Sequence, residues 1–411
     1  MSLSVRAIDG DELVAWVDVM NTAFHSNRSA EAGAASRREM LGDDFSRSLA
    51  AFDGSRLVAT YHSYTAELTL PGGACLPANA VTAVSVLPTH HRRGALTRML
   101  TYDLQAARQR GEAASILIAS EYPIYGRYGF GPATEQAAYS VETAAAQFTS
   151  SASGVVDLVE PRALRDVAPI IFDRFRRIYA GQIDRQPFDW DRRLGLVANP
   201  WRSPDQRSRY ALYTSSSGEP EGYLTYHVQG DWRHRVPSGV LEVQELVSVS
   251  SEAYVGLWRY MAEVDLVSSI SAGMRPVDEP LAWMLTNTRR ALEQTMRSDF
   301  LWVRPLDTPR MLEGRRYAAE ERVVFQVTDP LGMAGGRYAL EGGPSGARCR
   351  ATDVSPDIRL SMLALGALSL GGVSPHVLEA AGLVQEDAPG AINRVERLFH
   401  WGIVPWCSTF F

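Results

Sequence analysis

The sequence contains no lysine, so all 41 basic residues of this 411-residue chain are arginine. This absence excludes chemistry that needs a lysine amine, such as phosphate binding by a P-loop lysine or Schiff-base catalysis. A bias in genomic base composition explains the absence at least as well as a functional demand does.

Cysteine is also scarce: Cys75, Cys349 and Cys407 lie far apart and form no C-x-x-C pair. An odd, scattered set argues against a disulfide framework and against a structural zinc site. We therefore expect no metal and a reducing, cytoplasmic location. The N-terminus lacks a basic segment followed by an apolar run, and no apolar run reaches transmembrane length, so we expect no signal peptide and no membrane partner.

The overall charge is small. The formal net charge is −6, and 45% of the residues are apolar and 21% charged, as in an ordinary globular protein. A nucleic-acid partner is therefore not expected. The length exceeds what one hydrophobic core usually supports, which predicts two or three domains.

Residues 1–150 alternate predicted strands and helices, which favours an α/β (α+β) domain. The period of apolar residues is near 2 before Pro88 and near 3.6 after it, which predicts a strand, a loop and an amphipathic helix. Strands are expected at residues 4–8, 56–70, 80–87 and 114–119, and helices at residues 11–24 and about 96–107.

The serine-rich residues 149–154 have the composition of a linker and mark the first expected boundary. Residues 151–301 then repeat the order of strands and helices, but without an Arg-Arg-Gly loop, which predicts a degenerate second copy. Residues 302–411 change pattern again and predict a third, mixed α+β domain.

The segment from Val84 to Thr97 carries the strongest functional motif. A strand that ends near Pro88 leads into an Arg- and Gly-rich loop at a helix start, where unpaired N–H groups and the helix dipole favour an anion such as a pyrophosphate. The alternative is a surface loop whose arginines are merely solvated, and spacing alone does not decide between them. The candidate binding residues are Val84, Ser85, Val86, Arg92, Arg93, Gly94, Ala95, Leu96 and Thr97.

This segment resembles the acetyl-CoA motif of GNAT acetyltransferases, which reads Gln or Arg, two residues, Gly, any residue, and Gly or Ala. Here His91 stands at the first place and Leu96 at the last. In that superfamily the contacts are mainly through backbone N–H groups, so neither departure excludes binding of acetyl-CoA.

A second segment, residues 120–134, alternates glycines with aromatic residues after a predicted buried strand. Packing at a domain edge is the alternative explanation. Together the two segments resemble the enhanced intracellular survival (Eis) family of N-acetyltransferases over the whole chain. The resemblance implies two GNAT-type domains with mixed sheets, the second degenerate, followed by a domain similar to sterol carrier proteins.

The resemblance also implies site residues. It assigns the general acid to Tyr125 and not to the neighbouring Tyr122 or Tyr128. It also places Ser120 and Glu121 beside acetyl-CoA. The family uses the chain's own terminal carboxylate as general base, which here belongs to Phe411. The apolar tail, residues 404–411, supports a buried terminus, although a last strand packed on its own domain would explain it too.

The expected acceptor is a primary amine of a small molecule, aminoglycoside-like or other, or a peptide lysine. The resemblance implies that its pocket includes Phe24, Ser26 and Phe410. Family members that acetylate aminoglycosides have acidic side chains at the places of Ser26 and Phe410. Their absence here favours a less charged amine. Self-association into a hexamer, a trimer of dimers, is implied as well. The rival hypothesis is a non-catalytic carrier of lipid or acyl-CoA that uses the sterol-carrier-like domain.

Overall fold

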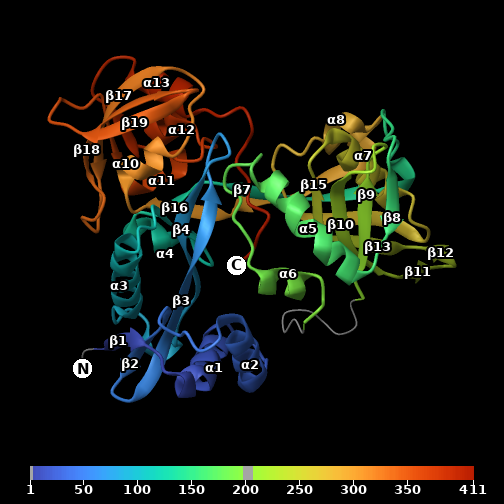
Figure 1. The fold of residues 1–411 in the computed structure, drawn as a ribbon, viewed down its shortest axis with the longest axis horizontal. Helices are drawn as coiled ribbons and strands as arrows, with labels where there is room; N and C mark the ends of the chain where they lie inside the picture. Colours follow the sequence, from blue (N-terminus) through green and yellow to red (C-terminus); the bar gives the residue numbers. More distant parts are fainter. Residues whose placement is uncertain (1–2, 198–206) are drawn as a thin grey trace. The chain divides into compact units, whose positions relative to one another are not determined.

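The fold comes from a computed structural model that describes residues 3–197 and 207–411 (Figure 1). The chain forms two compact units. The first contains Met1–Thr134, Phe300–Gly402 and Phe410–Phe411, and the second contains Glu135–Asp299 and Ile403–Thr409. No helix in the described ranges is both long and apolar enough to cross a bilayer.

A seven-stranded mixed sheet forms the first domain; six of its strands come from residues 1–150 and one, β16, comes from residues 301–305. Its strands, in spatial order, are β1 (Ser4–Ala7), β2 (Ser48–Asp53), β3 (Arg56–Thr69), β4 (Cys75–Val86), β5 (Ala114–Ile118), β16 (Leu301–Pro305) and β6 (Gly131–Pro132). The helices are α1 (Leu13–Ala23), α2 (Ala30–Leu41), α3 (Ala95–Gln109) and α4 (Tyr122–Tyr125).

The helices cover both faces of this sheet because side chains alternate along each strand. On β2, Leu49 and Ala51 belong to the core that α3 closes. The intervening Ala50 and Phe52 belong to the core that contains α1 and Ala34 of α2. Of the apolar face predicted between residues 96 and 107, Met99, Leu100, Leu104 and Ala107 are buried. Asp103, whose position in the pattern predicted it to lie off this face, is buried as well.

A second seven-stranded sheet repeats this arrangement in the second unit. Its strands, in spatial order, are β8 (Val155–Leu158), β9 (Arg209–Thr214), β10 (Pro220–Gln229), β13 (Gly239–Ser248), β14 (Val267–Arg275), β7 (Glu135–Glu142) and β15 (Leu292–Asp299). The helices are α5 (Pro161–Arg176), α6 (Pro187–Arg193), α7 (Ser251–Ala262), α8 (Leu281–Met284) and α9 (Thr288–Ala291), and β11 (Trp232–Arg233) pairs with β12 (Val236–Pro237).

In each of the two sheets, the sixth strand comes from the part of the chain next to the other domain. The sixth strand of the first sheet is β16, which follows the second domain in the chain, and the strand at the matching position of the second sheet is β7. Strand β7 precedes residue 150, the boundary expected from composition, and nevertheless lies in the second sheet.

The third domain is a five-stranded sheet with helices over one apolar core, and it matches the predicted mixed α+β pattern. Its strands, in spatial order, are β19 (Gly346–Ala351), β18 (Gly336–Gly343), β17 (Glu321–Thr328), β20 (Ile358–Ser361) and β21 (Val384–Glu386). The helices are α10 (Thr308–Glu313), α11 (Met362–Leu368), α12 (Pro375–Ala380) and α13 (Ala391–Phe399).

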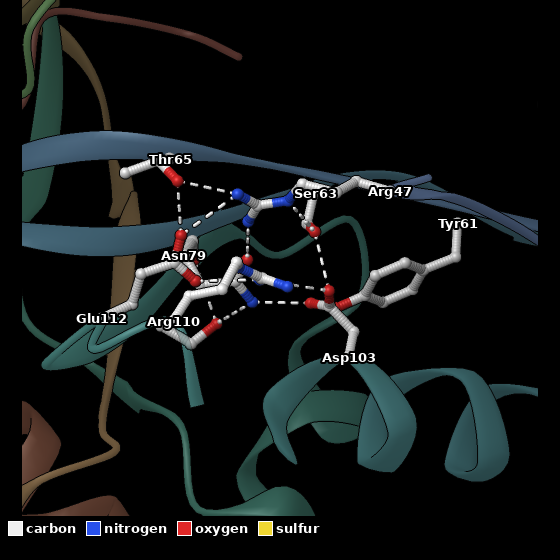
Figure 2. A network of polar contacts seen from close by, with 9 residues as sticks. Arg47, Tyr61, Ser63, Thr65, Asn79, Asp103, Arg110 and Glu112 are labelled. Carbon is white, nitrogen blue, oxygen red and sulfur yellow. Dashed lines mark hydrogen bonds and ion pairs between the residues drawn. The ribbon is translucent and has the colours of Figure 1, made fainter. Parts of the chain in front are cut away.

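A buried polar network joins α3 to the first sheet (Figure 2). The Asp103 carboxylate on α3 is only 3% exposed. It accepts hydrogen bonds from Tyr61 Oη at 2.7 Å, Ser63 Oγ at 2.8 Å and Asn79 Nδ2 at 2.6 Å. Because these donors stand on β3 and β4, the carboxylate fixes the helix against both strands.

The network continues through Arg47, which precedes β2. Its guanidinium donates to Asn79 Oδ1 at 2.6 Å and Thr65 Oγ1 at 2.7 Å, and it pairs with Glu112 Oε1 at 3.1 Å. Glu112 also pairs with Arg110 at 2.9 Å. The buried carboxylates are thus compensated by both charge and hydrogen bonds, as burial of charge requires.

Replacing Asp103 by alanine is expected to lower the free energy of unfolding by about 3 kcal/mol, because three buried donors lose their acceptor. Urea titration followed by tryptophan fluorescence measures the change. Tyr102→Ala is the matched control on the same helix, since Tyr102 is 55% exposed, and it should change stability by less than about 0.5 kcal/mol. Equal effects of the two substitutions would contradict the role given to Asp103.

Candidate active site

The separation of two parallel strands creates the candidate site. Strand β5 pairs with β4 only from Ala78 to Val81, whereas β4 continues to Val86. Residues 84–86 therefore present a strand edge that β5 does not cover, and an extended ligand can pair with such an edge. This is the edge predicted to bind a pantetheine arm.

A β-bulge shapes this edge. Ala83 has a φ of 52°, and the register between β3 and β4 shifts beside it. Thr60 Oγ1 donates to the Ala83 carbonyl at 2.8 Å and lies 2.7 Å from Ser85 Oγ. Because the Ser85 hydroxyl is buried against Thr60, a ligand can reach this edge only through the backbone. The Val86 carbonyl oxygen already lies 3.0 Å from His91 Nε2, so the backbone of Val84 and Ser85 is the part that remains.

The start of α3 lies next along the chain. Gly94 precedes the helix with a φ of 80°, and a Cβ there would meet no atom within 4 Å. Open space in front of the first amides of a 15-residue helix is a favourable place for an anion. The expectation of an anion site therefore has a structural basis at Gly94, Ala95 and Leu96.

The two arginines of the loop differ. Arg93 Nη1 pairs with Asp53 Oδ2 at 2.9 Å, and this bond, more than the nearby His90, lowers the pKa of Asp53. Arg92 is exposed and has no ion pair with another described residue. Of the two cations, Arg92 is therefore the one whose charge is not already compensated.

Three tyrosines compete for the catalytic role, and their environments separate them. Tyr122 is 62% exposed, and its ring lies 5.0 Å from that of Trp302, edge to face. The Tyr128 hydroxyl lies 2.8 Å from Thr97 Oγ1, so both groups already have a partner. Tyr125 is 4% exposed, and burial raises the pKa of its phenol to about 12, with smaller contributions from Tyr128 and Glu121.

Tyr125 and the strand edge share one apolar core. The cluster that contains Tyr125 also contains Ala95, and Val84 and Val86 pack against it. Ser120 and Glu121 are exposed and lie in the loop after β5, separated from it by Ala119. The two motifs, about 30 residues apart in the sequence, thus meet at one place in the fold.

The glycines of the second motif serve packing. A Cβ on Gly129 would lie 2.1 Å from Arg304 Nη1, and one on Gly131 would lie 2.0 Å from the Leu363 carbonyl oxygen. The alternative explanation, packing at a domain edge, is therefore correct for these glycines. It is compatible with a functional Tyr125 in the same segment.

Arg304 is a site-forming residue that the sequence did not reveal. It is fully buried on β16, donates to the Tyr128 carbonyl at 2.5 Å, and pairs with both carboxylate oxygens of Asp329 at 2.9 and 3.0 Å. An arginine within the apolar run Leu301 to Leu306 was the only available hint.

The expected acceptor residues are largely accessible. Phe24 is 49% exposed at the end of α1, and Ser26 is half-buried and donates its N–H to the Asn21 carbonyl at 2.8 Å. Phe410 is 62% exposed, so the expected burial of the apolar tail does not extend to this residue. The Phe411 ring lies 6.1 Å from that of Tyr64 on β3, edge to face, and is half-buried.

The buried His62 is close to Tyr64 in the same strand, with ring centroids 6.4 Å apart. Burial, reinforced by Arg37 and Arg47, lowers the pKa of His62 to about 3. His62 is therefore neutral at physiological pH, and its Nδ1 lies 3.0 Å from Ser48 Oγ.

Three family models match the chain. Residues 4–133 match an acetyltransferase (GNAT) domain, residues 181–305 match a second acetyltransferase (GNAT) domain, and residues 308–408 match a sterol carrier protein domain. The matches confirm the predicted fold class and the order of the three domains.

Relatives cover the whole chain. An uncharacterized N-acetyltransferase of Streptomyces avermitilis is 38% identical over 100% of this chain and 99% of its own. N-acetyltransferase Eis of Mycobacterium tuberculosis is 34% identical over 84% of both chains. The crystal structure of Eis1 from Mycobacterium abscessus has a TM-score of 0.86, 31% identity, and coverage of 99% of this chain and 100% of its own. The chain belongs to the Eis family of GNAT N-acetyltransferases.

Proposed function

We propose that this acetyltransferase moves the acetyl group of acetyl-CoA to a primary amine, with Tyr125 as general acid and the α-carboxylate of Phe411 as general base. The observation that carries the proposal is the buried phenol of Tyr125 in the same core as the open edge of β4. GNAT acetyltransferases use acetyl-CoA, so the donor follows from the family.

The binding site for acetyl-CoA combines the strand edge with the helix start. The backbone of Val84, Ser85 and Val86 pairs with the extended arm, and the amides of Gly94, Ala95 and Leu96 bind the pyrophosphate. Arg92 supplies charge, while Arg93 and Thr97 support the loop through Asp53 and Tyr128. Ser120 and Glu121 border the donor at the end of β5.

The reaction divides its proton transfers between two groups. The amine nitrogen attacks the thioester carbon, and the Phe411 carboxylate takes the proton that the nitrogen loses. The C–S bond then breaks, and the leaving sulfur takes a proton from Tyr125. The pKa of about 12 keeps Tyr125 protonated throughout the neutral range, so the donor form is always available.

The base needs a special environment. A free α-carboxyl group has a pKa of about 3.5, which is low for a base at neutral pH, so desolvation must raise it. Half-burial of Phe411 and the apolar ring of Tyr64 contribute to such an environment.

We also propose that Phe24, Ser26 and Phe410 line the acceptor pocket. We propose further that residues 1–150, 151–301 and 302–411 correspond to three functional domains, apart from β7, which lies in the second sheet, and β16, which lies in the first. Without acids at Ser26 and Phe410, the pocket favours an amine of low charge over a polycationic aminoglycoside. Acetyl-CoA consumption against a panel of amines identifies the acceptor. The non-catalytic carrier is not favoured, because the relatives are named N-acetyltransferases.

Gly94→Asp is expected to raise the Kd of acetyl-CoA at least about tenfold, because it places a negative charge where the pyrophosphate approaches. Calorimetry on the folded variant measures the affinity. Gly94→Asn is the matched control, since it imposes the same left-handed backbone and a similar size without the charge. Equal affinities of the two variants would move the pyrophosphate site elsewhere.

Tyr125→Phe is expected to lower kcat by about 10²- to 10⁴-fold without weakening acetyl-CoA binding, because only the proton donor is removed. Steady-state kinetics and calorimetry separate the two effects. Tyr122→Phe, at an exposed tyrosine in the same helix, should keep kcat within about twofold. A Tyr125→Phe enzyme with normal kcat would exclude this phenol as the acid.

Adding a few residues after Phe411 is expected to lower kcat by about 10²-fold or more, because the carboxylate becomes an amide that cannot accept a proton. Acetyl-CoA affinity should not change. The same residues added at the N-terminus serve as the control. If the C-terminally extended enzyme kept its normal kcat, the base would have to be another group.

A further inference from the structure

The second domain repeats the strand separation of the first but closes the exposed edge. Strand β14 pairs with β13 only up to Val243, so Leu246 lies three residues beyond the last pair, as Val84 does beyond Val81. Arg275 Nη1 donates to the Leu246 carbonyl at 2.9 Å. The backbone acceptor at this position is therefore already bonded.

Arg275 is held in place by its own neighbours. Its guanidinium pairs with both oxygens of Glu279 at 3.1 Å, and the Tyr254 hydroxyl donates to the same carboxylate. All three side chains are buried. A buried charge pair that is compensated in this way is a fixed part of the domain, because removing one partner would strongly lower the free energy of unfolding.

The C-terminal segment packs against this closed edge. Trp406 is 2% exposed and lies over Arg275, whose guanidinium carbon is 5.1 Å from the ring centroid. The indole Nε1 donates to the Met274 carbonyl at 3.1 Å, and the Trp406 N–H donates to the Ala180 carbonyl at 2.8 Å. The indole and the Phe175 ring also pack edge to face, with ring centroids 5.6 Å apart.

Two further residues of the segment are bonded by buried side chains. Gln182 Oε1 accepts from the backbone N–H of Ser408 at 3.2 Å and from its hydroxyl at 2.9 Å. Arg185 Nε donates to Thr409 Oγ1 at 3.0 Å, while the rest of its guanidinium pairs with Glu245 on β13. Gln182 is fully buried and Arg185 is 8% exposed, so both groups are rigid partners.

We propose that the second domain has become a binding site for the chain's own segment of residues 406–409, and that Gln182, Arg185 and Arg275 are positioning residues for the terminal carboxylate. The site replaces a second acyl-CoA site, because Arg275 occupies the strand edge that such a ligand would need. The part concerning catalysis rests on the proposed role of Phe411; the binding of the segment does not.

The covalent chain shows why this matters for the terminus. Phe410 and Phe411 follow Thr409 directly, so a fixed Thr409 keeps the end of the chain within about 7 Å of a given point. An unattached tail that begins at Ile403 has nine residues, the seven of Ile403–Thr409 and the two of Phe410–Phe411. Its end would spread over roughly 16 Å or more. Attachment at residues 406–409 thus greatly reduces the range of positions that the terminal carboxylate can occupy before it acts as a general base.

The test uses full-length enzyme with Gln182→Leu and Thr409→Val combined. Gln182 Nε2 has no partner among the described residues, and Arg185 keeps its pair with Glu245, so neither change leaves a new buried charge. Ile403→Ala is the matched control, because Ile403 lies three residues before the bound segment and is 38% exposed. Trp406→Ala is a second variant that weakens the attachment through packing.

Two measurements are made. Carboxypeptidase A releases C-terminal aromatic residues, so the rate of Phe411 release reports how often the segment detaches. We expect release from the double variant to be about 10- to 100-fold faster than from the parent, from the loss of three hydrogen bonds, and release from Ile403→Ala to be unchanged. The kcat should fall with unchanged acetyl-CoA affinity, and a C-terminal extension should cost the double variant less than it costs the parent.

The outcomes distinguish the two ideas. Faster release with normal kcat supports the binding site and means that the attached state still predominates during turnover. The role of Phe411 is then decided by the C-terminal extension, which leaves kcat normal only if Phe411 is not the base. Unchanged release in both the double variant and Trp406→Ala, with circular dichroism showing folded protein, overturns the binding site. A fall in kcat without faster release also overturns it, since the effect would then come from elsewhere in the domain.

Discussion

The divergence of β4 from β5 is the constraint on which the proposed active site depends. A strand inside a sheet has no free backbone groups, and a strand at the edge has a whole row of them. Because pairing stops at Val81 while β4 runs on to Val86, a short free edge arises in the middle of the sheet. The bulge at Ala83 and the start of α3 at Ala95 lie at this edge. The strand end, the start of α3 and the buried phenol of Tyr125 therefore lie around one apolar core.

The third domain contributes to this site through one buried ion pair. The Asp329 carboxylate pairs with Arg304 and accepts hydrogen bonds from the backbone N–H groups of Leu331, Met333 and Ala334. Its charge is therefore compensated on several sides. Arg304 in turn donates to Tyr128, three residues after the proposed acid. Breaking such a pair leaves a buried charge, at a cost of about 3–5 kcal/mol. The segment that carries Tyr125 is thus held by a domain that follows it by about 200 residues in the chain.

Sequence patterns predicted what depends on local periodicity. The strand, loop and helix around Gly94 and most of the buried face of α3 were predicted correctly, because apolar spacing reports burial directly. Contacts between residues far apart in the sequence could not be predicted from local patterns. No local pattern shows that β16 enters the first sheet, that Arg93 is paired with Asp53, or that Arg304 meets Asp329. The exposure of Phe410 was also missed, because an apolar residue near a buried one is usually buried as well.

The duplicated domain shows how one geometry can serve two purposes. Both copies contain parallel strands that separate after a short pairing, and in both the free carbonyl edge demands a partner. A domain that binds a ligand leaves the edge open, at the expense of its own stability. The second copy satisfies the edge internally with Arg275 and covers that arginine with Trp406. The surroundings of this closed edge hold a segment of the chain itself, through Trp406, Ser408 and Thr409. A degenerate copy that has lost the phosphate loop therefore retains a structural reason to be kept.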